Sequence, residues 1–222
     1  MVGFDLISDL GVTENFDWTN KPESLYCLIP GNISSDISKV RQVLTHLSTL
    51  YAGVFFVPGT LEYADSIDYQ ARTNALRTAC SGIKNTLLLY NSAVIVDTIA
   101  ILGTTGWYGP EHSNPISDNN RKNDIQYLGQ SIDKLQLYPD ISKILILSNS
   151  VPKPELYFGE EDSAIYDQLP LIACLPNDTM QKIHTWAFGS YNKEVDVIEH
   201  NIHFVSNPKG QKDPYWAKRI II

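Results

Sequence analysis

The stretch of sequence that decides the fold is GVFFVPGTLE, residues 53–62. Residues 53–57 are a continuous apolar run, and Pro58-Gly59 ends it. A short apolar run that is bounded by proline and glycine is typical of a strand buried on both faces of a sheet. Thr60, Leu61 and Glu62 therefore follow a strand end, which is where open α/β sheets bind ligands.

Other segments extend this pattern in both directions. Apolar runs predict further strands at residues 2–7, 25–29, 143–147 and 185–188. Periodic apolar positions predict helices at 36–50, 69–80 and 123–137, with Asp36 as the N-cap of the first. Three short strands at 87–89, 93–96 and 99–102 suggest a meander, and 195–198 with 202–205 suggest a closing hairpin. Strands that alternate with helices predict an α/β protein, and the strand clusters predict a second sheet.

The composition limits the possible classes of protein. The chain has 222 residues, 43% of them hydrophobic, and a net charge of −8. This length fits one domain over residues 1–222, and the hydrophobic content excludes a mostly disordered chain. The acidic balance argues against general nucleic-acid binding, because phosphates need a basic face. No apolar stretch approaches the roughly 18 residues of a membrane helix, and no signal peptide is visible, so we expect a cytoplasmic protein.

Small and polar residues follow each predicted strand, in the segments Ser8-Asp9-Leu10-Gly11, Pro30-Gly31-Asn32, Pro58-Gly59-Thr60-Leu61-Glu62, Ser148-Asn149-Ser150 and Gly189-Ser190-Tyr191-Asn192. In order and spacing these segments resemble the motifs of the calcineurin-like metallophosphoesterase family, from Phe4 to about Gly210. The resemblance implies a four-layer α/β/β/α sandwich with two mixed sheets. It also implies a pocket at the strand ends, where that family holds two metal ions.

The residues of this pocket depart from the family pattern. Asp9 stands where the first aspartate belongs, but the other positions lack the expected metal ligands and proton donor: Gly11, Asn32, Thr60, Leu61, Asn149, Ser190 and Asn192. Two divalent cations at one site carry a charge of +4, which one carboxylate and neutral amides offset poorly. Leu61 stands where the resemblance implies a proton-donating histidine, and it has no proton to give. We therefore expect a pseudoenzyme with a vestigial pocket, no metal, no other cofactor and no catalytic residues.

Three functions remain open at this point. The first is a protein-interaction or structural component, of a phage virion or another assembly, located in the cytoplasm or in the virion. Its partner is then another protein or a second copy of the chain. The second is a weak phosphodiesterase or phosphatase with one metal on Asp9, Asn32 and Asn149. The third is a nucleotide or small-molecule binding protein that uses the emptied pocket.

Aromatic residues outside the apolar strands are the candidates for an interface: Trp18, Trp107, Tyr108 and Tyr191. Tryptophan and tyrosine are good interface anchors because they bury a large area. Trp107 and Tyr108 lie in the polar segment 103–121, which we expect to be a long loop. The alternative is that these rings only cover the rim of the pocket.

Overall fold

The computed structural model describes residues 1–14, 16, 18, 20–64, 66–107, 115–156, 171–172, 182–191, 193–210, 212 and 214–222. Its helices are α1 (Ile37–Leu50), α2 (Tyr69–Cys80) and α3 (Pro115–Gln136). Its strands are β1 (Gly3–Leu6), β2 (Tyr26–Ile29), β3 (Gly53–Phe56), β4 (Thr86–Leu88), β5 (Ser92–Val96), β6 (Ile99–Thr104), β7 (Lys143–Ser148), β8 (Ile183–Phe188), β9 (Val195–Glu199), β10 (Ile202–Ser206) and β11 (Lys218–Ile221). Short 3-10 turns cover Leu61–Tyr63 and Pro154–Leu156.

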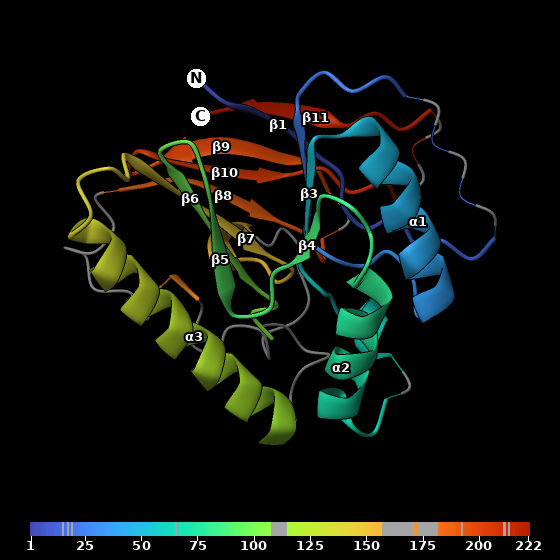
Figure 1. Cartoon of the computed structure of the whole chain (residues 1–222). Coiled ribbons are helices and arrows are strands. Elements are labelled where there is room, and N and C mark those ends of the chain that lie inside the picture. Colours follow the sequence, from blue (N-terminus) through green and yellow to red (C-terminus); the bar gives the residue numbers. More distant parts are fainter. Residues whose placement is uncertain are drawn as a thin grey trace.

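The strands form two mixed sheets, which Figure 1 shows lying between α1 and α2 on one side and α3 on the other. The first sheet has the order β11-β1-β2-β3-β4, and β1 to β4 are parallel in it. The second sheet has the order β5-β6-β7-β8-β10-β9, in which β6, β7, β8 and β10 are parallel. Side chains of both sheets share one apolar cluster that includes Leu6, Phe55, Ile101 and Leu145. The four-layer α/β/β/α sandwich is therefore confirmed.

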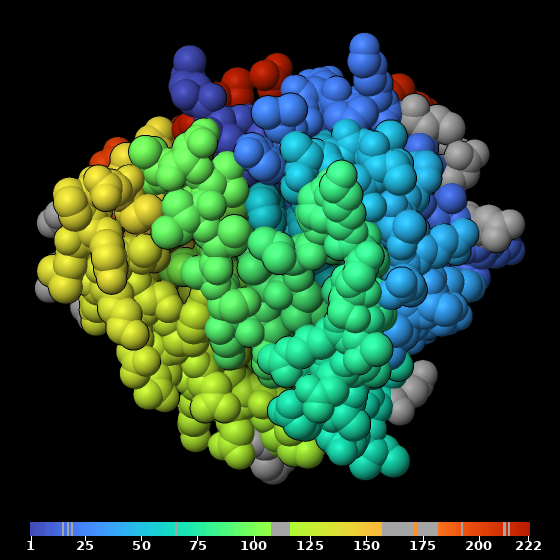
Figure 2. Space-filling view, in the orientation of Figure 1, coloured from blue at the N-terminus to red at the C-terminus, as the bar shows by residue number. Residues whose placement is uncertain are grey.

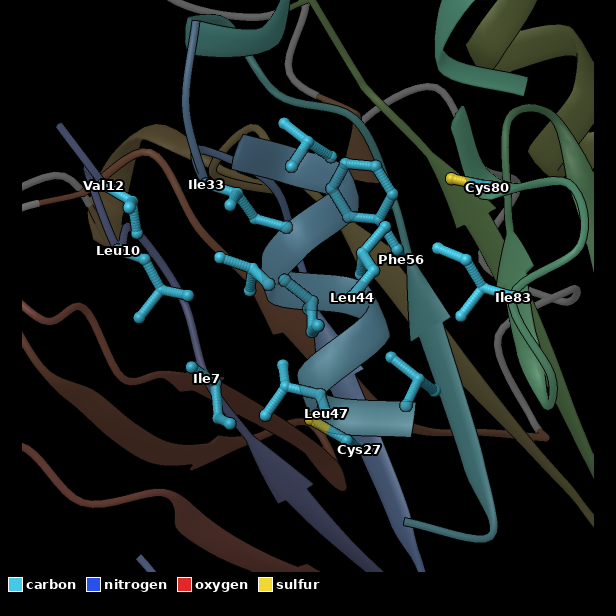
Figure 3. Close-up of a cluster of buried hydrophobic side chains, with 14 of the residues drawn as sticks. Ile7, Leu10, Val12, Cys27, Ile33, Leu44, Leu47, Phe56, Cys80 and Ile83 are labelled. Carbon is cyan, nitrogen blue, oxygen red and sulfur yellow. The ribbon is translucent and has the colours of Figure 1, made fainter. Parts of the chain in front are cut away.

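Helix α1 shows how the sequence pattern makes an outer layer. Asp36 caps the helix, because its Oδ1 accepts a hydrogen bond of 2.8 Å from the Ser38 N–H. Val40, Leu44 and Leu47 lie on its buried face, three and four residues apart. In Figure 3 the side chains of Leu44 and Leu47 face the strands of the first sheet, in the same apolar cluster as Ile7, Cys27 and Phe56. Burial of each leucine side chain stabilises the folded state by roughly 2 kcal/mol.

Two expectations about the elements are wrong, and one strand was not expected. The predicted meander does not form, because β4 pairs with β3 in the first sheet whereas β5 and β6 form a hairpin in the second. The segment expected as a long loop at residues 103–121 already contains the first turns of α3, which begins at Pro115. Strand β11 was not expected, and it pairs antiparallel with β1. Within the described ranges, no helix has both the length and the apolar character needed to cross a membrane.

Candidate functional site

The carboxyl ends of five parallel strands from both sheets meet at one place. Asp9 follows β1, Asn32 follows β2, Thr60 follows β3, Asn149 follows β7 and Ser190 follows β8. Asp9, Asn32 and Ser190 have left-handed backbone, with φ of 54°, 59° and 56°. Such a conformation turns the chain sharply and is unusual for residues other than glycine. These turns bring the side chains toward one another, and we call the five residues the strand-end cluster.

Asp9 is the only carboxylate of the strand-end cluster. Its Oδ1 accepts hydrogen bonds from Asn32 Nδ2 at 2.8 Å and from the Ser190 N–H at 2.9 Å. Its Oδ2 is buried and accepts no hydrogen bond from the described residues. Burial raises the pKa of Asp9 from 3.8 to about 6, since the hydrogen bonds to the carboxylate offset only part of the desolvation.

The two asparagine amides join the remaining strand ends. Asn32 Oδ1 accepts hydrogen bonds from Thr60 Oγ1 at 3.0 Å and from the Leu61 N–H at 2.9 Å. Asn149 Oδ1 accepts from the Thr60 N–H at 3.1 Å, and Asn149 Nδ2 donates to the Pro30 carbonyl at 2.9 Å. Asn149 is completely buried. It therefore connects the second sheet to two loops of the first.

Glycine allows the close approach around Asn149. A Cβ added at Gly59 would lie 2.4 Å from Asn149 Nδ2 and 2.6 Å from Asn32 Oδ1. A Cβ added at Gly189 would lie 2.4 Å from the Pro30 carbonyl oxygen. No side chain fits at either distance, so both positions need glycine for steric reasons.

The Glu62 carboxylate binds the backbone of the loops after β2 and β3. Its carboxylate accepts four backbone hydrogen bonds, from the N–H groups of Gly59 (2.6 Å), Asn32 (2.9 Å), Ile33 (2.6 Å) and Ser34 (3.1 Å). The residue is completely buried, and burial raises the pKa of this carboxyl from 4.5 to about 7. Glu62 thus positions the loops after β2 and β3 relative to each other.

The structure separates the predicted site residues into three groups. Asp9, Asn32, Thr60, Asn149 and Ser190 come together through hydrogen bonds, and the Leu61 N–H joins them through Asn32. Gly11 lies beside the cluster, where its N–H donates to the Asn32 carbonyl at 3.0 Å. Asn192 is outside the described residues.

The predicted interface residues have a different location. Trp107 is fully buried, with its ring centroid 4.8 Å from that of Tyr63, while Trp18 and Tyr191 are each 7% exposed. These three rings belong to the packed interior, so none of them presents a face to a partner in this conformation. Tyr108 lies outside the described residues.

Sequence reasoning missed Asp124 of α3, which lies beside the loop after β6. Its Oδ1 accepts from Asn91 Nδ2 at 2.6 Å and its Oδ2 from the Gly106 N–H at 2.7 Å. The residue is completely buried, and burial raises its pKa from 3.8 to about 6. The spacing of Asp124, Leu128 and Ile132 is the signal that could have found it, because residues four apart share one helix face.

Comparison with solved structures identifies the fold of the chain, which is metallophosphoesterase-like. No protein-family model matches its sequence, and no curated protein matches it either.

Three solved structures illustrate the likeness. Phosphopantetheinyl hydrolase from Mycobacterium tuberculosis has a TM-score of 0.70 at 13% identity, over 98% of this chain and 95% of that one. GAP50, described as the anchor in the inner membrane complex of Plasmodium, has a TM-score of 0.59 at 13% identity, over 94% and 72%. A 5'-nucleotidase from Staphylococcus aureus has a TM-score of 0.51 at 11% identity, over 98% and 52%.

The fold raises the question of whether the strand-end cluster suits two metal ions. Among the described residues, no group of three or more His, Cys, Asp or Glu side chains could hold a metal ion. Asn32 Oδ1 already accepts two hydrogen bonds, which use both of its lone pairs. The available donors therefore do not fit two adjacent divalent cations.

The prediction that the chain is a pseudoenzyme, and so not an enzyme, is wrong. The solved structures that share its fold include a hydrolase and a nucleotidase, and no described residue shows a loss of catalysis. The poor fit of the strand-end cluster to a two-metal centre restricts the mechanisms that it could use. It does not show that the chain lacks catalytic activity. At 11–13% identity the likeness establishes the fold, so no particular reaction is transferred to this chain.

Proposed function

We propose that this chain binds a partner protein, as an interaction or structural component of a larger assembly, through the edge formed by β4 and β5. Exposed apolar side chains on these two strands carry the proposal. Leu87 of β4 is 46% exposed and Ile95 of β5 is 58% exposed. Within the described residues, β4 ends the first sheet and β5 ends the second, and only Leu89 to Asn91 separate them along the chain.

Proteins normally prevent their edge strands from pairing with other chains. An open edge presents unpaired N–H and C=O groups, and charged side chains, prolines or bulges usually protect it. The segment Ser92–Val96 has the sequence SAVIV, which contains none of the charged residues or prolines that protect an edge. Adjacent open edges with exposed leucine and isoleucine are suited to a protein contact.

The strand-end cluster supports the same proposal. Its amides and the neighbouring backbone N–H groups bind one another, so most of its hydrogen-bonding capacity is used to join loops. GAP50 provides an example of this fold in a protein that is named for an anchoring role.

Purification of the tagged chain from its source cells tests the proposal. We expect a defined partner to copurify with the wild type, and Leu87→Asp/Ile95→Asp to reduce its recovery at least about tenfold, since buried charges oppose an apolar contact. The matched control is Ile67→Asp/Leu137→Asp, which changes two exposed apolar residues elsewhere, 97% and 82% exposed. Equal recovery with both double variants, or no partner above background, would contradict the proposal.

A second candidate function is hydrolysis of a phosphoester at the strand-end cluster. One observation favours it: Asp9 Oδ2 is a buried carboxylate oxygen that accepts no hydrogen bond from the described residues. The test is turnover of bis(p-nitrophenyl) phosphate with added Mn²⁺, compared among the wild type, Asp9→Asn and the exposed control Asp133→Asn. Turnover that only Asp9→Asn abolishes supports this candidate, and turnover equal to buffer in the wild type rejects it.

A further inference from the structure

A groove lies between the end of α2 and strand β4. It encloses about 390 Å³, and its walls include Arg77 and Cys80 of α2, Leu87 and Leu88 of β4, and Tyr90 and Ser92 beyond that strand. In Figure 2 the blue-green surface of α2 meets the green surface of β4 and β5 near the centre of this face. The groove therefore runs along β4, which ends the first sheet among the described strands.

The backbone of Leu88 in β4 faces this groove, whereas the Thr86 N–H already donates to the Ile83 carbonyl at 3.4 Å. The Val54 N–H donates to the Asn85 carbonyl at 2.8 Å, and the Leu89 N–H donates to the Phe56 carbonyl at 2.7 Å. Alternate residues of a strand point their backbone groups in opposite directions, so Asn85, Leu87 and Leu89 face β3. Leu88 consequently directs its N–H and its C=O away from β3, toward the open edge.

The charge of the groove selects the kind of occupant. Among the described residues that line the groove, Arg77 has the only charged side chain, and its guanidinium lies 5.8 Å from the centroid of the Tyr90 ring. No described carboxylate forms a salt bridge with it. In a chain with a net charge of −8, this local positive charge favours an acidic group from another molecule.

The apolar part of the groove suits an extended peptide. Leu87, Leu88 and Tyr90 line it, and Leu87 is almost half exposed. A peptide strand beside β4 would place alternate side chains on opposite faces, which separates those that meet apolar residues from those that meet solvent. Strand addition of this kind takes affinity from main-chain hydrogen bonds and specificity from the side-chain pockets.

We infer that the edge of β4 binds an extended segment of a partner protein, with an aspartate or glutamate of that segment against Arg77. The inference rests on the proposed function, because it specifies the chemistry of the partner at the β4 and β5 edge.

Two capped octapeptide pools provide the probes, each with valine or threonine at the other positions and either aspartate or lysine at the centre. Binding is measured by fluorescence anisotropy, and the Leu88 amide resonance of the ¹⁵N-labelled full chain reports where the pool binds. We expect the aspartate pool to bind at least about tenfold more tightly than the lysine pool and to shift the Leu88 amide resonance.

Charge reversal makes the test specific. Arg77→Glu should invert the preference of the two pools, since the attractive pair becomes a repulsive one. Lys122→Glu on α3 is the matched control, because it changes the net charge equally at an exposed position of another helix. It should leave both affinities unchanged within about twofold.

Several results would overturn the inference: equal binding of the two pools, no effect of Arg77→Glu, or no binding of either pool at about 1 mM. Copurification that still depends on Leu87 and Ile95 would then leave the proposed function standing without an acidic extended segment as the occupant. If neither the preference for the aspartate pool nor the copurification that depends on Leu87 and Ile95 is observed, the proposed function is rejected as well.

Discussion

Asp9 and Asn32 are joined by a hydrogen bond of 2.8 Å from Nδ2 to Oδ1, and both residues have left-handed backbone. For a residue other than glycine, a left-handed backbone conformation costs about 1 kcal/mol or more of conformational free energy. It persists only where its surroundings stabilise it. Here the stabilising contacts come from residues of both sheets, including Ser190 and, through Thr60, Asn149. The strand-end cluster is thus a point at which the two sheets hold each other in place.

Removal of the Asn149 amide should destabilise the fold. Asn149→Ala leaves the Thr60 N–H and the Pro30 carbonyl without their partner, and it opens a small cavity at a fully buried position. We expect the free energy of unfolding to fall by about 2–4 kcal/mol, as measured by urea denaturation. Asn123→Ala, at an exposed position of α3, is the control and should change it by less than about 0.5 kcal/mol. Similar effects of the two variants would contradict this role of Asn149.

Substitution of Gly59 tests the steric argument separately. Gly59→Ala places a Cβ 2.4 Å from Asn149 Nδ2, so it should destabilise the chain by at least about 2 kcal/mol. Gly129→Ala is the opposite case, because nothing lies within 4 Å of its added Cβ on helix α3. It should stabilise the chain by up to about 1 kcal/mol through helix propensity. Thermal and urea unfolding of both variants measure the contrast, and a neutral Gly59→Ala would show that the loops can move apart.

The buried carboxyl of Glu62 predicts a dependence of stability on pH. Its pKa is raised from 4.5 to about 7, so the folded chain holds this proton more tightly than the unfolded chain does. Over that interval the folded state binds more protons, and the free energy of unfolding therefore falls as the pH rises from about 4.5 to about 7. Above about pH 7 the Glu62 carboxyl causes no further change in the free energy of unfolding with pH. The contribution is on the order of 3 kcal/mol.

Glu62→Gln isolates that contribution, because the amide does not titrate. The difference in unfolding free energy between the wild type and this variant should change between pH 4.5 and 7 in the direction given above. Glu155→Gln, at an exposed position, should leave the profile of the wild type unchanged. A difference that is constant across this interval would show that Glu62 is ionised throughout.

Asp124 should be as important for stability as the residues of the strand-end cluster. Asp124 is completely buried, and Asp124→Ala removes the acceptor for the part-buried Asn91 Nδ2 and for the buried Gly106 N–H. The expected loss is about 2–4 kcal/mol, because buried donors without partners are costly. Asp133→Ala on the exposed face of the same helix is the control. Hydrogen exchange at the Gly106 amide should also increase in Asp124→Ala alone, and unchanged protection there would contradict this contact.

The sequence predicted those parts of the fold that local patterns encode. Apolar periodicity predicted helix α2. The family resemblance placed five residues near one another at the strand ends: Asp9, Asn32, Thr60, Asn149 and Ser190. The sheet to which β4 belongs was not, because a three-residue apolar strand carries no local signal for its partner. Asp124 was missed since its role depends on Asn91 and Gly106, which are distant in sequence. The burial of Trp18 and Trp107 likewise depends on packing that no local pattern shows.

The pairing of β11 with β1 has a consequence for how the protein forms during synthesis. Gly3 lies opposite Ile221, so β1 acquires its outer neighbour from a strand that follows all the other described strands along the chain. Until β11 is translated, β1 lacks this outer neighbour, and an exposed strand edge can pair with other chains. Completion of the first sheet must therefore follow translation of β11.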